Sequence, residues 1–100
     1  YLEEAVITPT IVLAELSIKL EKEKWNFEKY LDFIKSKSSI IPMNERIIKN
    51  IGYLYVNQRK LKPGFGISDA IIYSTALFAK AKVVTKDNDF RGLKEVIFLE

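Results

Sequence analysis

The sequence predicts an α/β domain in which a mostly parallel sheet is covered by helices on both faces, a three-layer α/β/α arrangement. Short apolar runs typical of strands alternate along the chain with longer amphipathic stretches typical of helices. The 100 residues suffice for one compact domain and not for two, and hydrophobic residues, at 48%, are numerous enough to form a core. We therefore expect a single domain over residues 1–100.

The first half of the chain is expected to contain two strands and two helices. A strand at Ala5–Thr8 precedes a helix from Pro9 to about Lys24, because proline is tolerated in the first turn of a helix. A second helix over Trp25–Lys35 has a partly apolar face. Ser39–Met43 is the second strand, weakened by its proline.

The second half repeats this alternation. Asn44 is expected to cap an amphipathic helix that ends near Leu61, and its Pro and Gly content makes Lys62–Gly66 a loop. The next helix, from Ser68 to about Lys80, is apolar nearly all round and is therefore expected to be buried. The remaining elements are a strand at Lys82–Thr85, a loop with one helical turn at Lys86–Gly92, and a strand at Val96–Leu99.

The composition limits the chemistry available to the protein. The chain has no Cys and no His, which excludes thiolate and imidazole chemistry and leaves carboxylates as its principal metal ligands. Carboxylates alone favour hard cations such as Mg²⁺. The net charge of +3 and pI of about 9.1 suit a nucleic-acid partner but are equally common in ordinary soluble domains. No apolar run is long enough for a bilayer, so we expect a cytoplasmic protein.

Four acidic residues are expected at one edge of the sheet. Ligand sites in parallel α/β folds lie where the carboxyl ends of the strands meet. Glu15 lies in the helix after the first strand, Asp69 opens the helix before the third, and Asp87 and Asp89 follow the third strand. We expect the carboxylates of Glu15, Asp69 and Asp87 to come close together.

Each acid also has a purely structural explanation. Glu15, which we expect to be half-buried, could pair with Lys19 at a gain of about 0.3–0.5 kcal/mol. Asp69 would suit the positive end of its helix, and residues 87–89 could form an ordinary polar turn. The convergence of three separate segments on one edge favours a shared site.

Two further features have alternative interpretations. The loop Lys62–Gly66, with Arg59 and Lys60 beside it, could cradle a phosphate, but it lacks the spacing of a nucleotide-binding fingerprint and is more typical of a helix terminator. Four aromatic residues are more typical of a core or a partner interface than of base stacking: Trp25, Phe27, Tyr30 and Phe33.

Three segments together resemble the PIN domain: Thr8–Leu16 (TPTIVLAEL), Ile67–Leu77 (ISDAIIYSTAL) and Val83–Phe90 (VVTKDNDF). Their order and spacing are most similar to the small VapC-type toxins of prokaryotic toxin–antitoxin pairs, and the resemblance covers the whole chain. It implies a Mg²⁺-dependent endoribonuclease, with Mn²⁺ as a possible substitute, that hydrolyses RNA phosphodiester bonds. It also implies a homodimer and a small antitoxin protein as partner.

The resemblance assigns roles to individual residues. Glu15 and Asp69 match the second and third metal-binding acids of the family. Asp87 matches the fourth, with Asp89 as the alternative, and Thr85 matches a hydroxyl beside the site. The residues expected to contact the RNA are Arg59, Lys62 and Lys86.

The chain departs from the family at its front end. PIN domains begin with a strand that ends in the first metal-binding Asp, followed by a helix, whereas this chain starts at Tyr1 with what resembles the end of that helix. We therefore expect a PIN-like fold that lacks its first strand and cuts RNA poorly alone. The alternative is a non-catalytic RNA- or protein-binding module. A nucleotide-binding domain fits less well, because the glycine fingerprint is absent. A receiver domain fits less well too, because it would need an acid pair on its first strand and a Lys on a late strand, and the order here is different.

Overall fold

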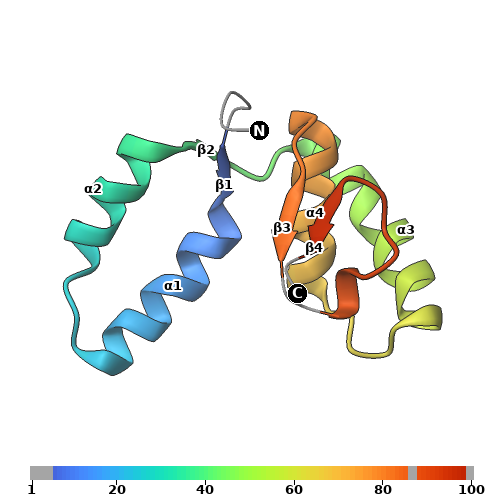
Figure 1. Cartoon of the computed structure of the whole chain (residues 1–100), viewed down its shortest axis with the longest axis horizontal. Coiled ribbons are helices and arrows are strands. Elements are labelled where there is room, and N and C mark those ends of the chain that lie inside the picture. The colour runs from blue at the N-terminus through green and yellow to red at the C-terminus, as the bar shows by residue number, and fades with distance from the viewer. Residues whose placement is uncertain (1–5, 86–87, 99–100) are drawn as a thin grey trace.

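The computed structural model describes residues 6–85 and 88–98, which form alternating helices and short strands (Figure 1). This alternation, with parallel strand pairing throughout the described residues, confirms the expected α/β class. The first half contains β1 (Ile7–Pro9), α1 (Thr10–Glu23), α2 (Phe27–Lys37) and β2 (Ser39–Ile41). The second half contains α3 (Glu45–Leu61), α4 (Ile67–Ala79), β3 (Val83–Thr85), the 3-10 helix η1 (Asn88–Phe90) and β4 (Val96–Phe98).

The described strands form two parallel pairs. β1 pairs with β2, with Ile7 opposite Ser39, and β3 pairs with β4, with Val83 opposite Val96. Both pairs lie against α4, which contacts β1 and β3 alike. Figure 1 shows β1 and β3 running in the same direction on either side of a gap.

A groove of about 150 Å³ lies between the two strand pairs. Its lining is mainly apolar and comes from β1, from the buried side of α4 and from the start of β3: Ile7, Pro9, Ile72, Ala76, Lys82 and Val83. Because the groove separates β1 from β3, each of these strands has a neighbour on one side within the described residues.

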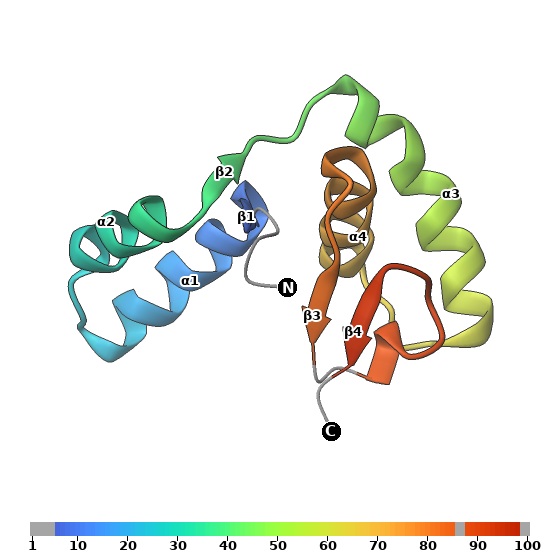
Figure 2. The ribbon, with the colours of Figure 1, turned by 45° about the horizontal axis from the view of Figure 1, so that its top comes forward.

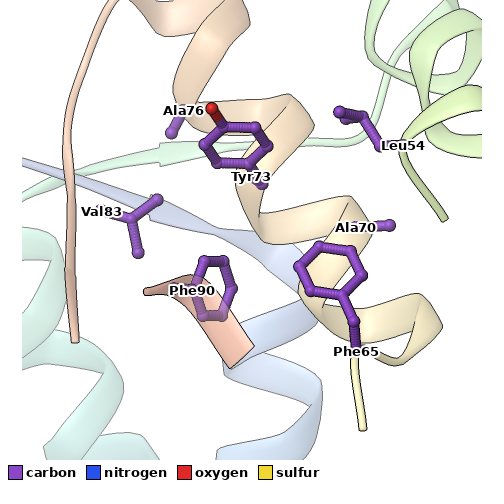
Figure 3. Close-up of a cluster of buried hydrophobic side chains, with 7 residues drawn as sticks. All are labelled: Leu54, Phe65, Ala70, Tyr73, Ala76, Val83 and Phe90. Carbon is purple, nitrogen blue, oxygen red and sulfur yellow. The ribbon is translucent and has the colours of Figure 1, made fainter. Parts of the chain in front are cut away.

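The main hydrophobic core lies between α3, α4 and the β3–β4 pair (Figure 3). Phe65 is a fully buried member of this core, and its ring packs edge to face with the Phe90 ring, with centroids 5.6 Å apart. As expected, α4 is largely buried. The hydroxyls of its buried Ser74 and Thr75 are satisfied, since Ser74 donates to the Ile47 carbonyl at 2.8 Å and Thr75 donates within the helix.

Capping residues explain where the helices begin. The Asn44 side chain accepts from the Ile47 N–H at 3.0 Å, which confirms the predicted cap of α3. Helix α2 begins later than expected because Asn26 caps it. Helix α4 begins at Ile67, one residue before the predicted start at Ser68, and Gly66 occupies the cap position.

The α1–α2 hairpin lies to one side of the molecule, away from β3 and β4 (Figures 1 and 2). Three of its aromatic side chains are exposed: the rings of Trp25 and Tyr30 stack on each other with centroids 6.1 Å apart, and Phe33 is 63% exposed. Phe27 is half-buried. Trp25, Tyr30 and Phe33 are therefore a surface feature of this chain and not part of its core. None of the helices in residues 6–85 and 88–98 has the length and hydropathy needed to span a bilayer.

Candidate functional site

Asp69 and Asp89 meet the same loop, Lys62–Gly66, which connects α3 to α4. Asp69 lies in the first turn of α4 and is half-buried. Its Oδ2 accepts a hydrogen bond from the Gly66 N–H at 2.8 Å, while the Gly66 carbonyl accepts from the Ala70 N–H at 3.1 Å. One carboxylate oxygen of Asp69 is thus fixed by the backbone of the loop, which orients the side chain at the start of α4.

The Asp89 carboxylate lies against Gly64, in the middle of this loop. A Cβ atom added at Gly64 would stand 2.9 Å from both carboxylate oxygens of Asp89, closer than such contacts occur in proteins. The half-buried Asp89 belongs to η1, which follows β3 and forms the helical turn expected in this region. Two of the predicted acids are therefore brought to a single three-residue segment, Gly64–Gly66.

The middle residue of this segment, Phe65, anchors it to the core. The Phe65 ring contacts the Phe90 ring, which directly follows Asp89 (Figure 3). The Phe65 carbonyl accepts from the Arg59 guanidinium at 3.2 Å, and the same guanidinium lies 5.2 Å from the centre of the Tyr55 ring. Arg59, expected to contact RNA, therefore also supports the loop. Sequence reasoning treated this loop as a helix terminator and missed its contacts with the acids. The sequence feature that pointed to these contacts was the pair of glycines, Gly64 and Gly66, on either side of the large apolar residue Phe65.

Glu15 differs from our expectation. It is exposed on α1 rather than half-buried, and Ile18, which the helical period places near it, is 59% exposed. No described part of the chain covers the face of α1 that carries these two residues. The prediction of a half-buried Glu15 was wrong for this reason. The alternative pairing also finds no support, because Glu15 and Lys19, both described, form no salt bridge.

The remaining predicted site residues are only partly described. Lys86 and Asp87 lie outside the described residues, and Thr85 is the last residue of β3, where only its backbone is described. Lys62 is half-buried, and its carbonyl accepts from the Phe65 N–H at 2.9 Å. In residues 6–85 and 88–98, no group of three or more acids lies close enough to hold a metal ion together.

The donor atoms near the loop fit a hard divalent cation in their chemistry. Carboxylates are the side chains that present charged oxygen ligands, and the chain has no His or Cys to favour softer metals. Asp69 and Asp89 are the two acids that the described structure brings to a common support. The fold and these residues together define an α/β protein with two acidic side chains that lie against one loop.

Comparison with protein-family models identifies the family to which this α/β protein belongs. The model of the family described as "PIN domain" matches residues 1–96. This match covers nearly the whole chain, so the protein belongs to the PIN domain family, as the sequence motifs indicated.

A solved structure has a similar fold. A chain of a "Toxin-antitoxin complex from Klebsiella pneumoniae" superposes with a TM-score of 0.67 and 23% sequence identity. The match covers 89% of this chain and 69% of that chain. At this identity, the likeness shows a shared fold. A search among curated proteins gave no match.

Proposed function

We propose that this protein is a divalent-metal-dependent endoribonuclease of the VapC type, the toxin of a toxin–antitoxin pair. The observation that carries the proposal is the attachment of Asp69 and Asp89 to one loop in a chain of the PIN family. The excess of basic residues and the similarity in fold to a chain of a toxin–antitoxin complex support it.

Each residue of the site has a role in this proposal. Asp69 and Asp89 would hold Mg²⁺ or Mn²⁺, with Glu15 and Asp87 completing the set and Thr85 beside it. The metal would activate a water and stabilise charge on the phosphate. Cationic side chains would hold the RNA backbone by charge. The residues proposed for this are Arg59, Lys62 and Lys86.

The groove between β1 and β3 supports a further part of the proposal. The family resemblance implies a strand that ends in another metal-binding Asp, and a parallel strand in this groove would join the two pairs into one sheet over α4. We propose that such a strand completes the site. The protein at its full natural length should then cut single-stranded RNA, whereas residues 1–100 alone should cut it poorly. Equal EDTA-sensitive cleavage by both would refute this part.

The substitution Asp69→Asn tests the proposed function at full natural length. Asn keeps the size of the side chain, and its amide oxygen can still accept from the Gly66 N–H, so the fold should survive. Loss of one negative ligand should lower metal-dependent RNA cleavage by about a hundredfold or more. It should also raise the melting temperature of the metal-free protein, because repulsion among the acids falls. Cleavage near the wild-type rate would show that Asp69 serves only to start α4.

A second candidate function is a binding module that does not cut. The absence of a three-acid cluster in the described residues favours it. RNA binding in a gel-shift assay, without any EDTA-sensitive cleavage at full length, would establish this alternative.

The exposed α1–α2 hairpin supports the proposed protein partners. Trp25, Tyr30 and Phe33 place three aromatic rings in solvent on one hairpin, which is typical of an interface. We propose that this surface serves a homodimer or an antitoxin, and that the protein acts in the cytoplasm. Measuring the molar mass by light scattering, alone and with the co-expressed neighbouring gene product, tests both partners.

A further inference from the structure

Position 64 requires a glycine for a reason other than its backbone conformation. Glycine is usually needed where φ is positive, but the one glycine in the described residues with positive φ is Gly92. An alanine at position 64 would therefore meet no backbone strain of that kind. Its Cβ would instead lie 2.9 Å from each carboxylate oxygen of Asp89.

The contact at Gly64 differs from that at the neighbouring Gly66. A Cβ at Gly66 would lie 3.8 Å from the nearest atom, Oδ2 of Asp69, which is ordinary van der Waals distance. The backbone at Gly66 is extended, with φ −99°, and is open to any residue. The two glycines of one loop therefore touch the two acids differently: Gly66 holds Asp69 by its N–H, and Gly64 admits Asp89 by lacking a side chain.

From these contacts, we propose that Gly64 is a positioning residue that sets where the Asp89 carboxylate stands relative to Asp69. The inference rests on the proposed function, in which both acids hold a divalent cation. A Cβ at position 64 would displace the end of the short Asp89 side chain rather than the backbone, because the nearest atoms are the carboxylate oxygens. The core contact between Phe65 and Phe90 would stay in place, so the acid would move while the fold persisted.

The test compares Gly64→Ala with the matched control Gly66→Ala in the same loop. In metal-free protein, the side-chain carboxyl ¹³C resonance of Asp89 should shift in Gly64→Ala and stay in place in Gly66→Ala. In calorimetric titration with Mn²⁺, Gly64→Ala should bind about tenfold more weakly, as expected when a support of a metal ligand is lost. Thermal melting of both variants without metal checks that they fold.

A double-mutant cycle separates positioning from general damage. If Gly64 acts through Asp89, the variants Asp89→Ala and Gly64→Ala/Asp89→Ala should bind Mn²⁺ equally weakly, and a further loss in the double variant would overturn the inference. An unshifted Asp89 resonance, or wild-type Mn²⁺ affinity in Gly64→Ala, would also overturn it and leave the proposed function standing. Failure of the wild-type protein to bind Mn²⁺ would instead overturn the metal-dependent function and this inference with it.

Discussion

The two halves of the molecule differ in how many of their side chains are buried. Residues 45–98 contain the core around Phe65, and six consecutive or near-consecutive residues of α4 are buried. In the described residues 6–41, Pro9 and Leu20 are the buried ones. Both halves have two helices and a parallel strand pair, yet only the second closes around its own apolar side chains. Similar secondary structure therefore does not imply similar packing.

The contrast extends to the candidate site. Asp69 and Asp89 belong to the packed half and are oriented by a loop whose central residue is in the core. Glu15 belongs to the open half and is exposed. We infer that the packed half orients its acids by itself, whereas the position of Glu15 depends on what covers the α1–α2 hairpin.

The largest expected effect is at Phe65. Phe65→Ala should lower the free energy of unfolding by about 3–5 kcal/mol, because it empties a fully buried site. The matched variant Phe33→Ala, at a side chain 63% exposed, should change it by less than about 0.5 kcal/mol. Urea unfolding of the two variants gives the comparison, and similar losses would show that the hairpin is as tightly packed as the core.

A smaller effect, confined to the open half, is expected at Leu20. Leu20→Ala removes a side chain of α1 that is 1% exposed and should cost about 2–3 kcal/mol locally. Because few buried contacts join this half to the core, hydrogen exchange should speed up in α1 and α2 and change little in α4. Equal acceleration in α4 would mean that the two halves unfold as one unit.

The smallest expected effect is the pH dependence contributed by Tyr73 in the packed half. Burial, and then the charge of Glu95, raise the pKa of the Tyr73 hydroxyl, which donates to the Lys94 carbonyl at 2.9 Å. The folded protein thus disfavours the phenolate, so this stabilisation is present below the ordinary value of 10.0 and is lost as pH rises through the folded pKa. Melting temperature measured from pH 8 to about 11 should fall less steeply in Tyr73→Phe, and identical slopes would contradict this assignment.

The local structure was largely predictable because caps and periodicity act over a few residues. Asn44 was recognised as a cap, and the apolar sequence of α4 indicated its burial. We expected α4 to start at Ser68, but Gly66 is its cap, and the Asp69 carboxylate satisfies the Gly66 N–H from three residues ahead. The position of the cap depends here on a hydrogen bond between a side chain and the backbone. Residue preferences at single cap positions do not describe such a bond.

The failures concern contacts between distant segments. The exposure of Glu15 depends on which layer covers α1. The close contact of Gly64 with Asp89 joins residues from two different connections. The metal-site assignment of Glu15, Asp69 and Asp87 stays a prediction, because Asp87 lies outside the described residues.

The connection between β3 and β4 has a consequence for the order of folding. These parallel strands are joined by residues 86–95, whereas β1 and β2 are joined through both α1 and α2, over residues 10–38. A shorter connection closes at a lower entropic cost, and contacts that are local in sequence form sooner. We therefore expect the β3–β4 pair and its neighbour α4 to form the folding nucleus. During synthesis, the first half of the chain would leave the ribosome before the surface of α4 that β1 contacts has been made.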